Sequence, residues 1–427
     1  MDTQRLGDVA RAPFSVFSGG QSEVTAVSAP GAQAALDANM QDGTQSPLIE
    51  GLLNRKSVLG TGPYAQVSDA VLAANSRAAE ADLRAAMLRS EAEATNWLPT
   101  LGPNISLTSL GDVVTQLVVE QVLFDNGRKQ AERDYAQADV EVAAVALAQD
   151  TNDRVMTALD LYLKAQEAEA QAAVNAKAME QMNHFAYVME ERVKGGVSNR
   201  ADLNVVLQKR NQMQADLAQD RGTAETAMAE LNAMAATPLN GVSGLSAVGD
   251  FGPGDQPLTV MKAEAEAERA IAESIAVRAG FLPQLTATGV GGSEGSSGSL
   301  NVGAAQGLGL GTGASLEALE AQREGAAARV SQVQEDAGRT LEGMKANLAA
   351  LKEQEAQAAV LAEDAARNYD VYADQQRSGH RSVPDVVGIF ETKVRTEREA
   401  TTLRYDIARA ELRIAALMGA LVNGDRI

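Results

Sequence analysis

The sequence of 427 residues contains no cysteine and only two histidines, His184 and His380. Without cysteine, the chain forms no disulfide, has no thiolate nucleophile or thiolate-bound metal, and carries no lipid on an N-terminal cysteine. Two histidines give little basis for a histidine metal site or a Ser-His-Asp triad. The acidic residues are spread along helical stretches rather than paired. We therefore expect no enzyme activity and no cofactor or metal.

Aromatic and basic residues are also scarce. Aromatic residues make up 4% of the chain, and Trp97 is the single tryptophan. There are 37 Lys and Arg against 57 Asp and Glu, a formal net charge of −20. This balance argues against a nucleic-acid partner, because phosphate contacts need a basic face. Alanine is abundant, and small side chains suit closely packed helices better than one large core, so the composition predicts long bundled helices.

Long apolar runs are missing as well. No stretch approaches the roughly 20 apolar residues of a membrane-spanning helix. Residues 1–21 lack the apolar run of a signal peptide, so no export signal is visible in this chain. Residues 1–62 are rich in Gly, Ser, Gln and Asp without a helical period, which predicts a mostly irregular leader.

The chain carries an internal duplication. A glycine is followed by an aspartate six residues later at 196–202 and again at 379–385, 183 residues further on. An apolar-Leu-Pro-polar-Leu segment occurs at 97–101 and at 281–285, 184 residues apart. Two landmarks that keep nearly the same spacing indicate two structural repeats.

Each repeat follows the same predicted plan of short helix, β-hairpin, very long helix, turn and helix. The first repeat, 63–236, is predicted to contain a helix over 64–93, a hairpin over 96–124, and helices over 128–194 and 199–236. After a linker at 237–257, the second repeat, 258–421, is predicted to contain a helix over 258–279, a hairpin over 281–310 that turns at 291–298, and helices over 315–378 and 384–421. Residues 422–427 form a tail. The first long helix would extend about 100 Å, at 1.5 Å per residue.

The four predicted strands have the length and alternation of transmembrane strands. Each is about ten residues long, as a tilted strand in a bilayer requires. Four strands do not close a useful barrel, and open sheet edges are not tolerated in hydrocarbon. If these strands span a membrane, several copies of the chain must combine them into one barrel.

Over residues 64–421 the sequence resembles the TolC family of outer-membrane efflux and type I secretion channels. The resemblance is carried by Leu98-Pro99, by the segment from Gln121 to Arg128, by 281–285 and by the two Gly-x5-Asp turns. The stretch 70–75 is similar to the family's opening helix, although Ser76 stands where a proline is usual.

The resemblance implies a mainly α-helical protein with a membrane β-barrel part. Duplicated long-helix hairpins would form the α-barrel tunnel of a homotrimer, and each chain would give four strands to a shared twelve-stranded barrel. The implied location is the outer membrane of a Gram-negative bacterium, in contact with its lipid and extending into the periplasm. The implied partners are a periplasmic adaptor and an inner-membrane ABC or RND transporter.

The resemblance also assigns a gate to the two turns. In the family, a carboxylate of the first turn pairs with an arginine of the second, and the matching residues here are Asp202, Arg381 and Asp385. Gly388 stands where a relative with a well-known gate has a second acidic residue. The two aspartates could equally cap their helices, and Gly196 and Gly379 could supply left-handed turn positions.

Basic residues beside the turns are candidates for adaptor docking, namely Arg192, Lys194, Arg200 and Arg377. A second function class stays open on the sequence alone. A structural coiled-coil scaffold, whose hairpins mediate assembly in water, would also account for the helices, the missing signal segment and the few aromatic residues. The sequence does not identify the cargo or the transporter.

Overall fold

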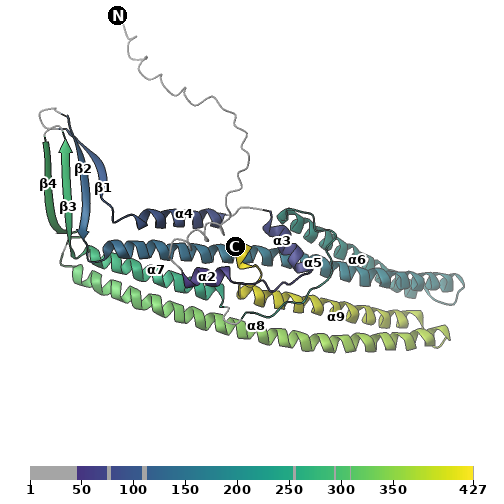
Figure 1. Cartoon of the computed structure of the whole chain (residues 1–427). Helices are drawn as coiled ribbons and strands as arrows, with labels where there is room; N and C mark the ends of the chain where they lie inside the picture. Colours follow the sequence, from purple (N-terminus) through teal and green to yellow (C-terminus); the bar gives the residue numbers. More distant parts are fainter. Residues whose placement is uncertain are drawn as a thin grey trace, which may run out of the picture.

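The protein is elongated, with a β-sheet at one end and helices that run from it to two tips at the other end (Figure 1). The structure, a computed structural model, describes residues 46–74, 78–107, 113–252, 256–292, 295–307 and 309–426. The C-terminus lies near the middle of the long axis, beside the short helix α2.

Two helices of almost equal length dominate the fold, as predicted. They are α5 (Arg128–Lys194, 67 residues) and α8 (Thr312–Arg377, 66 residues). Each turns back at its tip into a 35-residue helix, α6 (Arg200–Met234) or α9 (Val383–Leu417). The remaining helices are α2 (Pro47–Leu53), α3 (Pro63–Leu72), α4 (Ala78–Ala94) and α7 (Leu258–Gly280), with a 3-10 turn, η1 (Gly424–Arg426).

The sheet contains four antiparallel strands in the order β1-β2-β3-β4. The strands are β1 (Thr100–Leu107), β2 (Val113–Phe124), β3 (Pro283–Gly292) and β4 (Gly295–Ala304). Hairpin β1-β2 from the first repeat joins hairpin β3-β4 from the second through pairs such as Val118 with Val290. Strands β1 and β4 therefore form the two edges of the sheet within one chain.

The helices continue the order of the strands. Helices α4, α5, α7 and α8 contact one another in that sequence, so each strand of the sheet is aligned with one helix of a wall below it. Beyond the middle of the molecule, α5 pairs with α6 and α8 pairs with α9. The duplication in the sequence thus becomes two similar halves side by side.

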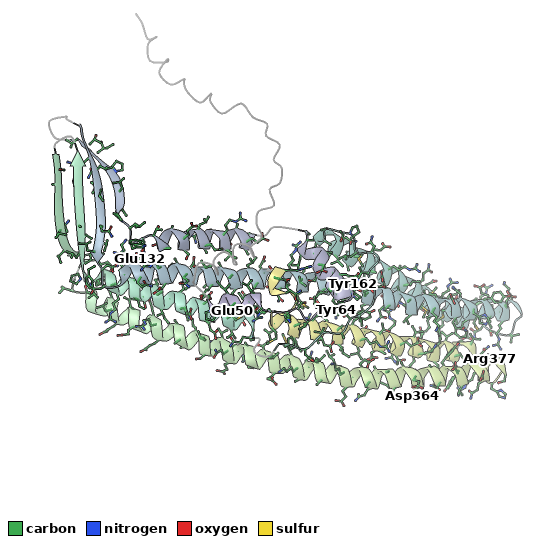
Figure 2. The ribbon with its side chains drawn as sticks, viewed as in Figure 1. Glu50, Tyr64, Glu132, Tyr162, Asp364 and Arg377 are labelled. Carbon is green, nitrogen blue, oxygen red and sulfur yellow. The ribbon has the colours of Figure 1, made fainter. Side chains whose placement is uncertain are left out.

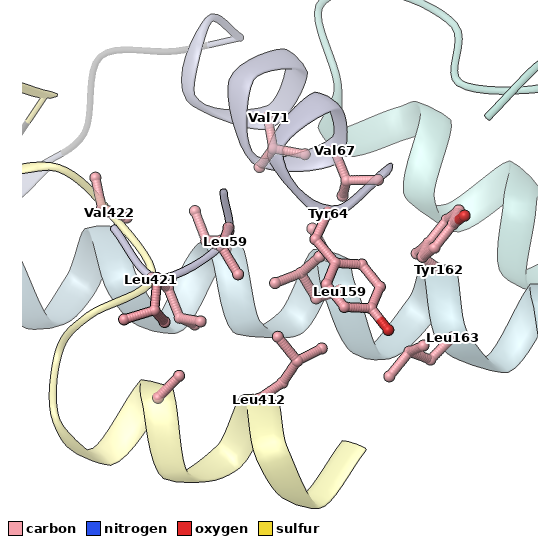
Figure 3. Packing of buried hydrophobic residues seen from close by; sticks show 14 of the residues in the cluster. Leu59, Tyr64, Val67, Val71, Leu159, Tyr162, Leu163, Leu412, Leu421 and Val422 are labelled. Carbon is pink, nitrogen blue, oxygen red and sulfur yellow. The ribbon is translucent and has the colours of Figure 1, made fainter. Parts of the chain in front are cut away.

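The central core joins the two halves (Figure 3). Tyr64 of α3, Leu159 of α5 and Leu412 of α9 are all fully buried there. The rings of Tyr64 and Tyr162 meet edge to face at 6.2 Å, and the Tyr162 hydroxyl donates a hydrogen bond to the Gly244 carbonyl at 2.7 Å. Burial raises the pKa of Tyr64 to about 12. A second aromatic contact, between Phe185 and Phe390, joins the halves closer to the tips, with ring centroids 5.7 Å apart.

The predicted irregular leader differs from the structure in its last part. Residues 1–45 lie outside the described residues, but Pro47–Leu53 form helix α2. Ser46 caps this helix by accepting a hydrogen bond from the Ile49 amide. Ile49 and Leu52 are buried against α5 and α7, so tertiary packing stabilises a helix too short to show a period.

The single helix predicted for 64–93 is wrong, because the structure has two helices there. Helix α3 ends at Leu72 and α4 begins at Ala78. Helix α3 buries Tyr64, Val67 and Val71 in the central core, whereas α4 lies on α5 nearer the sheet. The pattern of apolar residues is continuous, but the two segments pack in different places.

The last helix ends four residues earlier than predicted, at Leu417. Gly419 has φ of 65°, and the amides of Gly419 and Ala420 donate to the carbonyls of Ala416 and Ala415, which closes the helix in a Schellman motif. The turn of the second hairpin is also tighter than the predicted 291–298, because the ladder continues to the pair Gly292 and Gly295. In the parts of the chain that the structure describes, no helix is long and apolar enough to cross a membrane.

Candidate functional site

One face of the sheet is almost entirely apolar. Directly paired residues share a face, so the register places Leu101 with Val119 and Leu285 with Val302 on this face. Ile105, Leu300 and Val302 are 69%, 69% and 75% exposed. Among its described side chains the polar members are Thr115, Gln121 and Ser296. We call this the apolar face.

The opposite face of the sheet is mixed and mostly polar. It contains valines along β2 and β3, together with ten polar side chains: Thr100, Asn104, Gln116, Glu120, Gln284, Thr286, Thr288, Ser297, Ser299 and Asn301. It is partly shielded, because Val114 and Thr286 on it are each only 8% exposed. The sheet is therefore amphipathic, and its more exposed face is the apolar one.

The two long helices differ strongly in burial. Helix α5 packs on α4, α6, α7 and α9 and buries a side chain at almost every turn. Helix α8 buries only four alanines over its length: Ala326, Ala337, Ala358 and Ala373. Val360, Leu361 and Val371 on α8 are more than half exposed. One side of α8 is thus unpartnered within a single chain, as is the neighbouring edge strand β4.

The two tips have the same local architecture. Gly196 (φ 73°) and Gly379 (φ 81°) occupy left-handed positions that close α5 and α8 in Schellman motifs. Three residues after each glycine, a side chain caps the next helix. Asn199 accepts from the Asp202 amide at 2.8 Å, and Ser382 accepts from the Asp385 amide. The Gly-x5-Asp pattern thus encodes a helix end and the following helix start.

The structure gives the predicted gate residues local partners within one chain. Asp385 accepts a hydrogen bond from the Ser382 hydroxyl at 2.6 Å, which completes a capping interaction. Arg381 donates from Nε to Gln375 at 3.1 Å and lies 4.6 Å from the centre of the Tyr372 ring. Within the described part of one chain, no ion pair joins Arg381 to Asp202. That pairing stays a prediction for the assembly.

The predicted docking residues lie around both tips. Lys194 pairs with Glu191 at 2.7 Å, and Arg377 pairs with Asp374 at 3.0 Å, both on exposed helix surface. Arg192 and Arg200 flank the first tip, at the end of α5 and the start of α6. Figure 2 shows Arg377 at the tip end of the molecule.

Ion pairs above the tips join the two halves, and sequence reasoning missed them. Asp220 of α6 accepts from Arg398 of α9 at 2.6 and 3.2 Å, and from Asn175 of α5 at 2.7 Å. Nearer the tips, Lys209 of α6 pairs with Glu391 of α9 at 2.6 Å. We call these two contacts the inter-half links. No local motif marks them, because the partners lie 178 and 182 residues apart.

A third contact between the halves lies closer to the central core. Arg409 of α9 pairs with Glu167 at 3.0 Å and lies 3.7 Å from Asp160, both on α5. Burial raises the pKa of Asp160, while Arg413 and Arg409 oppose that shift. Asp160 and Glu167 are seven residues apart and therefore lie on the same side of α5. This spacing is the feature of the sequence that indicates a charged stripe on the helix.

The described residues contain no group of three or more His, Cys, Asp or Glu side chains that could hold a metal ion. The features described above are the amphipathic sheet, the helical wall and the two tips.

Several solved structures share this fold. The outer-membrane channel OprN matches with a TM-score of 0.73 and 15% identity, covering 86% of this chain and 93% of that chain. The CmeC outer-membrane channel of Campylobacter jejuni matches with a TM-score of 0.67 and 12% identity, covering 84% and 86%. The outer-membrane protein VceC of Vibrio cholerae matches with a TM-score of 0.68 and 14% identity, covering 91% and 97%. No protein-family model and no curated protein matches the chain.

The chain therefore has the fold of outer-membrane channel proteins over most of its length. The resemblance to the TolC family, which the sequence motifs indicated, is confirmed at the level of the fold. At these identities the shared feature is the architecture of paired long helices with a four-stranded sheet.

Proposed function

We propose that this chain is one subunit of a homotrimeric channel in the outer membrane of a Gram-negative bacterium. Three sheets would close into a twelve-stranded barrel, and three helical walls would continue it as a tunnel through the periplasm. The observation that carries the proposal is the amphipathic sheet, whose apolar face is exposed and whose two edges are open. Hydrocarbon would cover the apolar face, and pairing of β4 with β1 of the next subunit would remove both edges.

The dimensions support a membrane role. Strands β3 and β4 each have 10 residues, which at about 3.3 Å per residue and a tilt near 40° give roughly 25 Å, the height of the apolar band of outer-membrane barrels. The unpartnered side of α8 follows directly below β4, so a neighbouring subunit that pairs with β4 would also cover α8. A scaffold in water would leave the apolar face exposed, and no observation favours that alternative.

The transport proposal is that substrates enter from an inner-membrane ABC or RND transporter through a periplasmic adaptor. Docking of the adaptor at the tips is supported by four basic residues that flank both turns: half-buried Arg192 and the exposed Lys194, Arg200 and Arg377. Reversing all four charges should abolish transport while trimer yield is unchanged. Transport that survives the fourfold variant would place docking elsewhere.

The gate proposal concerns how the tunnel mouth is held shut. Arg381 and Asp202 would pair in the assembly, and three copies of Asp385 would line the narrowest point. Each exposed Arg381–Asp202 ion pair contributes only ~0.2–1 kcal/mol, so the three copies of the pair and the inter-half links would hold the mouth shut together.

The double variant Arg381→Ser with Asp202→Ala should raise conductance, and Asp385→Ala should reduce cation preference. Unchanged conductance in the intact double variant would show that other residues hold the tip.

The channel itself is tested by reconstitution in planar bilayers. The wild-type protein should require detergent for extraction. Its insertion should give discrete conductance steps that favour cations, because the chain has a formal net charge of −20. A protein that stays in solution without detergent and gives no conductance would contradict the proposed function.

A further inference from the structure

A pocket of about 530 Å³ lies between α7 and α8, just below the sheet. Its walls combine polar and apolar side chains; the large apolar ones are Ile275 of α7, Leu282 just after α7, and Leu316 and Leu319 of α8. Ile275 and Leu282 are each 42% exposed, which is unusual for large apolar side chains between packed helices. An apolar ligand that filled this pocket would remove that surface from water.

Two arginines line the same pocket from opposite helices. Arg278 comes from the last turn of α7 and Arg323 from the fourth turn of α8. Both residues are exposed, and among the described residues neither guanidinium has a hydrogen-bond or ion-pair partner. Glu320 is the single acidic side chain in the lining. The pocket is thus locally cationic in a chain whose formal net charge is −20.

The corresponding place in the first repeat is different. Leu98 is the counterpart of Leu282, 184 residues earlier, and it lines a pocket that also contains Arg128 and Lys129. There Arg128 pairs with Glu132 at 2.8 Å, and Lys129 donates to the Asn96 carbonyl. By the same offset Arg278 and Arg323 correspond to Ala94 and Asp139, so the first repeat has no arginine pair at this place, and the cations beside Leu98 have partners within the chain.

The height of the pocket matches the headgroup layer of a bilayer. Leu282 directly precedes β3, and Arg278 lies four residues before it, about 6 Å lower along the helix. If the sheet spans the hydrocarbon, the headgroup layer begins at its lower end and is roughly 5–8 Å thick. Arg278 then lies where lipid phosphates lie, Arg323 lines the same pocket from α8, and Leu282 adjoins the acyl chains. This step rests on the proposed membrane function.

We propose that this pocket binds an anionic phospholipid of the leaflet nearest the helices, with its phosphate between Arg278 and Arg323 and part of an acyl chain against Leu282, Leu316 and Leu319. Charge-assisted hydrogen bonds from two guanidinium groups would select the phosphate and a negative headgroup. The lipid would fill the gap between α7 and α8, where the sheet joins the helical wall.

Native mass spectrometry of the full-length trimer in detergent tests this site. Phosphatidylglycerol and the zwitterionic phosphatidylcholine are added as probes at equal concentration. Wild-type trimers should retain phosphatidylglycerol about tenfold better than phosphatidylcholine. Arg278→Gln with Arg323→Gln should remove most of this preference. Arg329→Gln, an exposed arginine on α8 outside the pocket, is the matched control and should keep it.

The other outcomes each overturn the proposal in an identifiable way. Equal lipid preference in the wild type and in an intact double variant would refute the site while leaving the channel proposal standing. Displacement of the lipid by millimolar inorganic phosphate would show a small-anion site instead. A chain that forms no detergent-requiring oligomer would refute both proposals. Circular dichroism and trimer mass confirm that the double variant folds.

Discussion

Asp220 is a residue on which the contact between the halves depends. Its carboxylate receives two hydrogen bonds from Arg398 and one from Asn175, so three helices meet at one side chain. Asn175 is 2% exposed, and the Asp220 and Arg398 side chains are 13% and 30% exposed. A charge pair shielded to this degree contributes more than an exposed surface pair, provided that both partners remain.

Asp220→Asn is therefore expected to destabilise the protein by ~1–3 kcal/mol, because Arg398 loses its charged acceptor in a partly shielded site. Thermal unfolding in detergent measures this effect. Asp336→Asn is the matched control, because Asp336 pairs with Arg339 on exposed helix surface and should change stability by less than ~0.5 kcal/mol. Equal small shifts for both variants would show that the Asp220 network does not hold the halves together.

Glu141 of α5 gives a prediction about pH. Glu141 is 7% exposed, and this burial raises its pKa above the ordinary 4.5. Nearby Glu268 raises the pKa further, while a hydrogen bond from Ser46 opposes the shift. The folded state therefore binds this proton more tightly than the unfolded state, and stability from this group falls as pH rises above 4.5.

Glu141→Gln should raise the unfolding midpoint relative to the wild type at neutral pH, and the difference should disappear at about pH 4, where both states of Glu141 are protonated. Thermal scans of both proteins across that range supply the comparison. A variant that is less stable than the wild type at neutral pH would mean that the ionised carboxylate is stabilising and that the hydrogen bond from Ser46 dominates.

At the scale of elements, the two tips show how a short sequence pattern specifies a hairpin of long helices. Gly196→Ala or Gly379→Ala should cost ~1 kcal/mol each, because alanine is strained at a positive φ. Hydrogen exchange should increase at the altered tip. Gly222→Ala, at an open position inside α6, should instead stabilise its helix by ~0.5–1 kcal/mol. If the tip variants changed stability in the same direction and by the same amount as Gly222→Ala, the proposed role of the left-handed turn would be wrong.

The two faces of strand β4 give a second element-scale prediction. Leu300→Lys places a charge on the apolar face near the strand centre and should cost ~2–4 kcal/mol of insertion free energy in a bilayer. Ser299→Lys adds the same charge on the opposite face and should be tolerated. The yield of detergent-extracted trimer from membranes compares them. A lower yield for Ser299→Lys than for Leu300→Lys would reverse the assignment of the faces.

Much of this architecture could be predicted from local patterns. The first long helix followed from a run without Gly or Pro and the second from the repeat, and the hairpins followed from alternation beside Leu98-Pro99 and Leu282-Pro283. The inter-half links and the pairing of β2 with β3 could not be predicted, because their partners lie more than 150 residues apart. Helix α2 was not predicted, and α3 was merged with α4 into one predicted helix. Tertiary packing, rather than periodicity, determines the bounds of α2 and α3.

At the scale of the whole molecule, the proposed trimer would make this chain one third of a closed structure. Strand order and helix order coincide, so the outer edge of β4 and the outer side of α8 are both left without a neighbour on the same side of the chain. A single rotation that pairs β4 with β1 of another copy would cover both features. Cyclic symmetry with three copies satisfies every edge and leaves no free strand, which four strands in one chain do not achieve.

The most direct test of this account is the mass of the detergent-extracted particle, corrected for bound detergent. The account predicts three copies of the 44.7 kDa chain and no stable oligomer once detergent is removed. A monomer in detergent, or an oligomer that is fully soluble without detergent, would contradict the trimeric membrane channel.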